Sequence, residues 1–192
     1  FDLDQAFSNL AFMLKINPSY SLGDLSSTPA NEIDDTVLKR IVIEHESGLH
    51  LITGSKNVLD DNEMISPELF DRFVTFLVEN YTYIIIDLPT HVLDPYHQYL
   101  VERCDQLCMV CPMDISGFTR TKQYMDLASR YLDTDKIKLV FNRCNKRAAY
   151  GMSNEELTTE FGYPIAAELV NDWELNVQAN SLCVPLGEID PN

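Results

Sequence analysis

Asp87 is the residue of this sequence whose type and position most directly suggest chemistry. It follows the apolar run Tyr83-Ile84-Ile85-Ile86 and stands shortly before Pro89. A continuous apolar run of this length predicts a strand that is buried on both faces of a parallel sheet. Ligands of open α/β sheets bind beyond the carboxyl ends of the strands, so the Asp87 carboxylate would lie where Mg2+ and its phosphates are held. The alternative is a carboxylate that only caps the turn before Pro89.

A second pair of carboxylates, Asp2 and Asp4, stands at the beginning of the sequence. The stretch Phe1-Asp2-Leu3-Asp4 looks like the tail of a strand, and the apolar residues Phe7, Leu10, Ala11 and Leu14 follow it at helical spacing. Both carboxylates would then lie at a strand end. The alternative is that they cap the helix and interact favourably with its positive end. Because the pattern opens within a strand, we expect the sequence to be a fragment of a longer protein.

Two other motifs are weighed and set aside. The cysteines Cys104, Cys108 and Cys111 have the spacing C-x3-C-x2-C of an iron-sulfur motif, but in a strand the last two would point to opposite faces, whereas cluster ligands must converge. The stretch Gly54-Ser55-Lys56 resembles the end of a phosphate-binding loop. The phosphate-loop motif requires another glycine five residues before Gly54, but Gly48 stands six residues before it. These 192 residues therefore contain no such loop.

The segments between these residues alternate between strand and helix patterns. Ser66-Pro67-Glu68 combines a capping hydroxyl, a proline at the first helical position and an early carboxylate, and therefore predicts a helix start. Asp114 is expected to cap another helix. The predicted strands are 49–53, 83–87, 107–112, 137–141 and 164–167, and the main predicted helices start near residues 5, 35, 66, 95, 114, 153 and 171. This alternation predicts an α/β fold, a three-layer sandwich with a mainly parallel sheet.

Composition limits the classes of function. The 192 residues are enough for a single domain that buries about 70% of its unfolded surface. The net charge of −16 disfavours direct binding of nucleic acid, because such a surface repels phosphate backbones. No apolar run approaches the length of a membrane span, and the odd number of cysteines, five, is typical of thiols in a cytoplasmic protein.

Five motifs in order resemble the MinD/ParA superfamily of P-loop ATPases, and within it the CpaE/TadZ branch that is associated with Tad (Flp) pili. They are Asp2-Leu3-Asp4, Glu44-His45-Glu46-Ser47-Gly48-Leu49, Ile84-Ile85-Ile86-Asp87-Leu88-Pro89, Val140-Phe141-Asn142-Arg143, and Asn171-Asp172 with Pro185-Leu186. The resemblance covers nearly the whole chain. It implies a P-loop NTPase-like fold that lacks its N-terminal strand and phosphate loop in this chain.

The resemblance also implies roles for individual residues around magnesium. Asp87 is similar to the Walker B aspartate, which reaches Mg2+ largely through water. Asp2 and Asp4 resemble the paired aspartates of the deviant Walker A′ stretch. By that similarity Asp4 would orient or activate the attacking water, and Asp2 would help to order the water shell of Mg2+.

Four further residues are implied to bind the nucleotide base. Asn142 resembles the residue that reads adenine, because its amide offers a donor and an acceptor side by side. Arg143 would stack on the base or contact phosphate, although a surface ion pair is the alternative. Pro185 and Leu186 stand where relatives cover the base with apolar surface.

By resemblance the chain is expected to bind ATP or ADP with Mg2+, to form a homodimer, and to be a cytoplasmic protein recruited to the cell pole or the inner-membrane face. It would act as an ATP-dependent switch that localises or assembles a pilus machine through partner proteins. Hydrolysis would require an intact phosphate loop upstream of Phe1. The alternatives are a catalytically inactive localisation scaffold with the same fold, or another positioning ATPase of the MinD/ParA type.

Overall fold

The computed structural model describes residues 1–3, 9–26, 28–54, 65–88, 95–144 and 154–189. The chain divides into two compact units. The first contains Phe1–Thr90 and Leu175–Asn192, and the second contains His91–Glu174. The prediction of a single domain over residues 1–192 stays a prediction.

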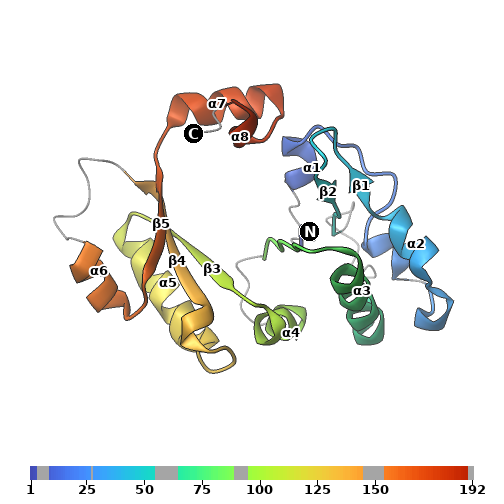
Figure 1. The fold of residues 1–192 in the computed structure, drawn as a ribbon, viewed down its shortest axis with the longest axis horizontal. Helices are drawn as coiled ribbons and strands as arrows, with labels where there is room; N and C mark the ends of the chain where they lie inside the picture. Colours follow the sequence, from blue (N-terminus) through green and yellow to red (C-terminus); the bar gives the residue numbers. More distant parts are fainter. Residues whose placement is uncertain (4–8, 27, 55–64, 89–94, 145–153, 190–192) are drawn as a thin grey trace. The chain divides into compact units, whose positions relative to one another are not determined.

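The first unit holds short helices, one long helix and a small antiparallel pair of strands (Figure 1). Its elements are α1 Leu10–Met13, the 3-10 helices Gly23–Leu25 and Ala30–Glu32, α2 Asp35–Arg40, β1 Ile43–Glu44, β2 His50–Leu51, α3 Pro67–Asn80 and α8 Leu186–Ile189. The helix α7, Trp173–Leu182, begins in the second unit and continues in the first. Strand β2, with the two residues His50 and Leu51, is shorter than the predicted strand over 49–53.

Helix α3 starts where the sequence predicts. The hydroxyl of Ser66 accepts a hydrogen bond from the N–H of Leu69 at 3.2 Å, and Pro67 is the first helical residue. The helix buries one apolar stripe, which consists of Leu69, Phe70, Phe73, Phe76 and Leu77. Burial of one such aromatic or aliphatic side chain contributes about 1.5–3 kcal/mol to the free energy of folding. The five side chains of this stripe therefore stabilise the first unit substantially.

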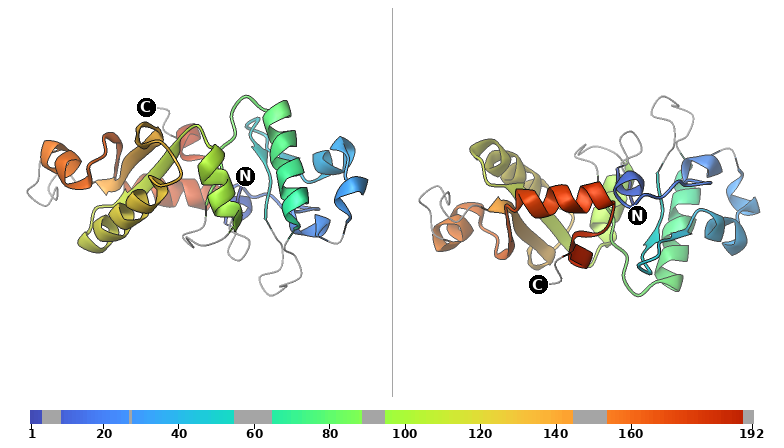
Figure 2. Two further views of the ribbon diagram at one scale, coloured as in Figure 1. Left: turned by 90° about the horizontal axis from the view of Figure 1, so that it is seen from below. Right: turned by 90° about the horizontal axis from the view of Figure 1, so that it is seen from above.

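The second unit is a parallel sheet of three strands with helices (Figures 1 and 2). Its elements are α4 Pro95–Arg103, β3 Leu107–Pro112, α5 Ile115–Ala128, a 3-10 helix Thr134–Lys136, β4 Ile137–Cys144, α6 Asn154–Phe161 and β5 Ile165–Val170. The strand order is β3-β4-β5. Strand β3 pairs with β4 from Leu107 with Ile137 to Pro112 with Asn142. The α/β class with a parallel sheet is confirmed.

Three aromatic rings join the sheet to its helices in the second unit. Phe141 of β4 lies 5.6 Å from Phe118 of α5 and 5.8 Å from Phe161 of α6, measured between ring centroids. The rings of Phe118 and Phe161 are 5.5 Å apart. Helices α5 and α6 therefore pack on the same face of the sheet, the face on which Phe141 and its register partner Cys111 lie.

The prediction that 107–112 is buried on both faces is wrong. Leu107 and Cys111 are buried, whereas Cys108 is exposed and Val110 is 55% exposed. Successive side chains of a strand point to opposite faces. Since α5 and α6 cover the face of Cys111, the apolar residues on the other face remain accessible in the described part of the chain.

The prediction of a doubly buried strand over 83–86 is also wrong. These residues are extended without belonging to a strand, and the exposed fractions of Tyr83 and Ile85 are 88% and 82%. The segment has a neighbour on one side: the nitrogen of Phe1 donates to the carbonyl of Ile85 at 2.6 Å. Burial on both faces requires a covering layer on each, and the described residues leave Tyr83 and Ile85 uncovered.

Gly117 offers a test of the junction between β3 and α5. A Cβ added at Gly117 would lie 2.5 Å from Cγ and 2.8 Å from the carbonyl oxygen of Pro112. We expect Gly117→Ala to lower the free energy of unfolding by about 1–3 kcal/mol, because overpacking forces backbone to shift. The midpoint of urea denaturation, followed by far-UV circular dichroism, measures this change.

Gly187→Ala is the matched control for that substitution. Gly187 lies in α8 and a Cβ there would meet no atom within 4 Å. Since alanine has the higher helix propensity by about 1 kcal/mol, this variant should be as stable as the parent or more stable. Equal midpoints for the two variants would contradict the predicted clash at Pro112.

Candidate functional site

Asp2 and Asp87 lie next to each other on neighbouring extended segments of the first unit. They form a parallel β-bridge, in which the N–H of Leu3 donates to the carbonyl of Asp87 at 3.0 Å and the N–H of Asp87 donates to the carbonyl of Phe1 at 2.8 Å. Side chains in register on adjacent strands share a face. The structure therefore brings together the two carboxylates that the sequence placed at separate strand ends.

The Asp2 carboxylate is buried, with 1% of the residue exposed. Its Oδ2 accepts a hydrogen bond from the N–H of Leu10, the first residue of α1, at 3.3 Å. Asp87 is exposed. A buried carboxylate is costly unless hydrogen bonds or cations compensate its charge. The pair thus combines one anchored carboxylate with one that solvent and ligands can reach.

Thr53 lies at the end of a third neighbouring segment, and the sequence analysis missed it. The N–H of Asp2 donates to the carbonyl of Ile52 at 3.0 Å, and Thr53 is the next residue. Thr53 is 2% exposed, and its Oγ1 has no hydrogen-bond partner among the described residues. Its position at the end of the predicted strand 49–53, just before Gly54, did not by itself mark it as a site residue.

We expect Thr53→Val to leave the protein as stable as the parent or to raise its free energy of unfolding by about 1 kcal/mol. Valine has the same shape, and the substitution removes a buried hydroxyl whose desolvation is not repaid by a hydrogen bond. Urea denaturation without Mg2+ or nucleotide measures the change. A loss of stability would show that the hydroxyl has a partner in the folded protein. Thr36→Val, at a residue of α2 outside this site, is the control for the methyl replacement.

The residues present fit a magnesium ion. The donor set consists of carboxylate and hydroxyl oxygens, which hard divalent cations prefer. Among the described residues, no group of three or more His, Cys, Asp or Glu side chains could enclose a metal ion. Mg2+ usually keeps several waters and binds through one or two carboxylates together with phosphates, so a sparse set of this kind suits it. Asp4, the predicted partner of Asp2, lies outside the described residues.

Asn142 and Arg143 lie near the end of strand β4 of the second unit, whose last residue is Cys144. Asn142 is half-buried, and its Oδ1 accepts a hydrogen bond from the backbone N–H of Arg143 at 2.8 Å. Arg143 is exposed and has a positive φ of 59°. An amide oxygen has two lone pairs, so Asn142 keeps both donor and acceptor capacity. Its role in reading adenine stays a prediction, as does the contact of Arg143 with base or phosphate.

Pro185 and Leu186, the predicted apolar cover of the base, lie at the start of α8. Pro185 is half-buried and Leu186 is 47% exposed. Both side chains are accessible to a ligand, and their contact with the base stays a prediction.

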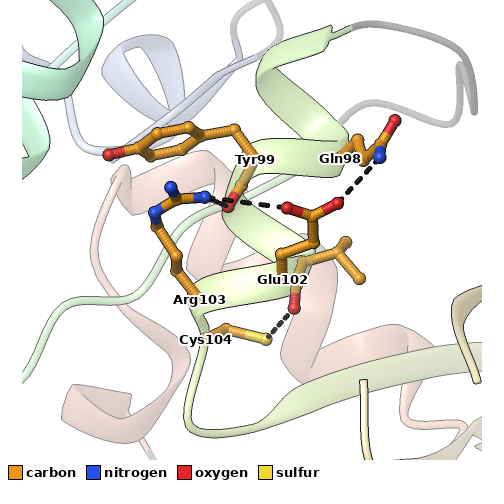
Figure 3. A network of polar contacts seen from close by, with 6 residues as sticks. Gln98, Tyr99, Glu102, Arg103 and Cys104 are labelled. Carbon is orange, nitrogen blue, oxygen red and sulfur yellow. Dashed lines mark hydrogen bonds and ion pairs between the residues drawn. The ribbon is translucent and has the colours of Figure 1, made fainter. Parts of the chain in front are cut away.

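The three clustered cysteines do not converge. Cys104 follows α4, and its thiol donates to the carbonyl of Val101 at 3.4 Å (Figure 3). Cys111 is buried against α5, and Cys108 is exposed on the opposite face of β3. Burial raises the pKa of both the Cys104 and the Cys111 thiols, which favours the neutral form. These thiols therefore have the environment of structural cysteines.

The polar side chains near Cys104 bind one another. Gln98 donates to Glu102 at 2.7 Å, and the guanidinium of Arg103 lies 3.8 Å from the ring centroid of Tyr99 (Figure 3). Arg103 also donates to the carbonyl of Tyr99 at 3.3 Å. These contacts all lie within helix α4. The polar side chains of this helix therefore have a structural role, because they stabilise the helix itself.

Comparison with known proteins identifies the fold. No protein-family model matches the chain, and no curated protein matches it. Among solved structures, a ParA family ATPase from Chlorobium tepidum TLS is similar over 100% of this chain and 78% of that chain, with a TM-score of 0.84 and 19% identity.

Two cell division proteins are also similar. The ATPase MinD of Pyrococcus furiosus has a TM-score of 0.75 and 19% identity, over 100% of this chain and 77% of that one. A chain of the MinC:MinD complex of Aquifex aeolicus has a TM-score of 0.76 and 18% identity, over 99% and 75%. The chain has the MinD/ParA fold, a P-loop NTPase-like fold.

Proposed function

We propose that this chain is the switch domain of an ATPase of the MinD/ParA type, which binds ATP with Mg2+ and changes its partners with the state of the nucleotide. The observation that carries the proposal is the pairing of Asp2 with Asp87 in a parallel bridge between two neighbouring extended segments. The MinD/ParA fold supports the proposal of nucleotide binding, because ligands of open α/β sheets bind beyond the carboxyl ends of the strands.

Each residue of the proposed site has a distinct task. The exposed carboxylate of Asp87 would accept hydrogen bonds from water bound to Mg2+, and the buried carboxylate of Asp2, which accepts a hydrogen bond from the N–H of Leu10, would help to order that water. Asp4 orients the attacking water and accepts its proton. Bound Mg2+ supplies positive charge that neutralises the phosphate oxygens.

Four residues recognise the nucleotide base in this proposal. Asn142 pairs its amide with the edge of adenine, and Arg143 stacks on the base or binds a phosphate. Pro185 and Leu186 cover the base with apolar surface. The exposed position of Arg143 and the partial exposure of the other three residues support these roles.

At a finer level we propose a protein of the CpaE/TadZ type that acts as a homodimer in the cytoplasm and places a Tad pilus machine at the cell pole. The order of the five motifs supports this assignment. None of the helices in the described part of the chain combines the length and the apolar character of a membrane span.

The test is a titration of labelled ATP against the full-length protein, with Mg2+ and with EDTA. We expect saturable binding that Mg2+ strengthens, together with slow release of phosphate. Binding without phosphate release would favour the localisation scaffold with the same fold. If neither ATP nor ADP binds in the presence of Mg2+, the proposal of a nucleotide switch is wrong.

A further inference from the structure

Strand β5 is the outermost strand of the sheet in the second unit. It pairs on one side with β4, where Leu139 is the register partner of Ile165 and Phe141 that of Glu168. Among the strands that the structure describes, none pairs with the other side of β5 (Figure 1). An edge of this kind presents backbone N–H and C=O groups to a further strand.

A groove of about 730 Å³ runs along this open edge. It is lined by the consecutive residues Pro164–Glu168 and by Thr158 and Thr159 of the preceding helix α6. Successive side chains of a strand point to opposite faces of a sheet. A groove that contacts five residues in a row therefore follows the edge of the strand rather than one of its faces. Helix α6 forms the second wall.

The side chains along the groove allow a close approach. Ala166 and Ala167 are small and exposed, and Ala166 is the extra residue at a register shift between β5 and β4. Edge strands are usually protected by lysine, proline, inward-pointing charge or a β-bulge, and here Pro164 and the register shift at Ala166 lie at the start of β5. Within β5 the only charged residue is Glu168, and it is exposed. The strand is thus open to pairing from Ala167 to Val170, which follows the register shift.

We propose that the open edge of β5 takes up an extended basic segment of a partner protein as an added strand. Backbone hydrogen bonds would give the affinity, and alternate side chains in the groove would give the specificity. Glu168 is the only charged residue among those lining the groove, so a lysine or arginine on the added strand would lie beside an opposite charge.

The same charges disfavour a second copy of this chain as the occupant. Two copies would each bring a net charge of −16 to the contact, and antiparallel pairing of two β5 strands would bring two Glu168 carboxylates close together. Like charges across a strand pair or an interface are destabilising. A basic strand would instead be attracted both by the net negative charge of the chain and by the carboxylate of Glu168.

The experiment uses two synthetic peptides of about eight residues, capped at both ends, in which valine alternates with lysine or with glutamate. Hydrogen exchange of the full-length protein and fluorescence anisotropy of labelled peptide report on binding. We expect the lysine peptide to slow exchange of the Ile165–Val170 amides and to bind at least about tenfold more tightly than the glutamate peptide. The difference should shrink as salt screens the charges.

Glu168→Lys and Asp105→Lys separate this site from general attraction to an acidic surface. Both replace an exposed carboxylate by an amine, but Asp105 precedes β3, which β4 separates from β5. We expect Glu168→Lys to reduce binding of the lysine peptide by about tenfold or more and Asp105→Lys to change it by less than about threefold.

Three results would overturn the proposal. The first is that neither peptide slows exchange in Ile165–Val170. The second is that Glu168→Lys and Asp105→Lys weaken binding equally. The third is protection of Ile165–Val170 that rises with protein concentration in the absence of peptide, which would identify a second copy of the chain as the occupant.

Discussion

Replacing Asp87 by alanine is expected to lower Mg2+-dependent ATP turnover of the full-length protein by about 10- to 100-fold, the usual loss when a group that orders the surroundings of a metal is removed. The fold should persist. Asp87 is exposed, and the bridge to Asp2 is made by backbone groups that alanine retains. Phosphate release at saturating ATP, measured with and without Mg2+, gives the effect, and circular dichroism gives the fold.

Glu79→Ala is the matched control, because it removes an exposed carboxylate at the end of α3 without touching the bridge. We expect its turnover to equal that of the parent. Asp4→Ala should lose turnover as Asp87→Ala does. Asp2→Asn, which keeps the size of the buried side chain, should weaken the dependence on Mg2+. Full turnover in both the Asp87→Ala and the Asp4→Ala proteins would refute the assignment of the site.

Helix starts could be predicted from the sequence because the interactions that define them are local. Ser66 caps α3, and the side chain of Asp114 accepts a hydrogen bond from the N–H of Gly117 at 2.7 Å, so both predicted caps are confirmed. The side chain and the N–H it binds are three residues apart in each case. No contact with a distant part of the chain is needed for such a cap.

Burial of strands could not be predicted, because it depends on distant elements. The runs 83–86 and 107–112 are both apolar, but one face of each is exposed in the described structure. An apolar run shows that a strand tolerates burial on both faces, and it does not show which layers cover it. Pattern alone therefore overestimated how enclosed these segments are.

The structure shows that two of the predicted site residues are neighbours, and the roles of all the predicted site residues stay predictions. The sequence predicted Asp2 and Asp87 at separate strand ends, and in the structure the two residues are joined by an isolated parallel bridge outside the named strands. Thr53 could not be found from residue type, since a threonine at a strand end usually has a hydrogen-bond partner. Its buried hydroxyl without a partner among the described residues became visible only in three dimensions.

Phe141→Ala is expected to lower the free energy of unfolding of the second unit by about 3–5 kcal/mol, the usual cost of deleting a buried phenylalanine. Phe141 is 1% exposed, and its ring contacts Phe118 of α5 and Phe161 of α6. Alanine would leave a cavity at a point where the sheet and both helices meet. Hydrogen exchange of the β3, β4 and β5 amides at increasing urea measures the loss unit by unit.

Phe12→Ala is the control for this substitution, because Phe12 is 79% exposed and belongs to the first unit. Exposed side chains outside special features change stability by about 0.5 kcal/mol or less, so this variant should unfold like the parent. If Phe141→Ala were equally mild, α5 and α6 would have to collapse into the space of the lost ring. The β4 amides would then remain protected from hydrogen exchange. This result would show that packing of the rings of Phe118, Phe141 and Phe161 is not the main interaction between the two helices and the sheet.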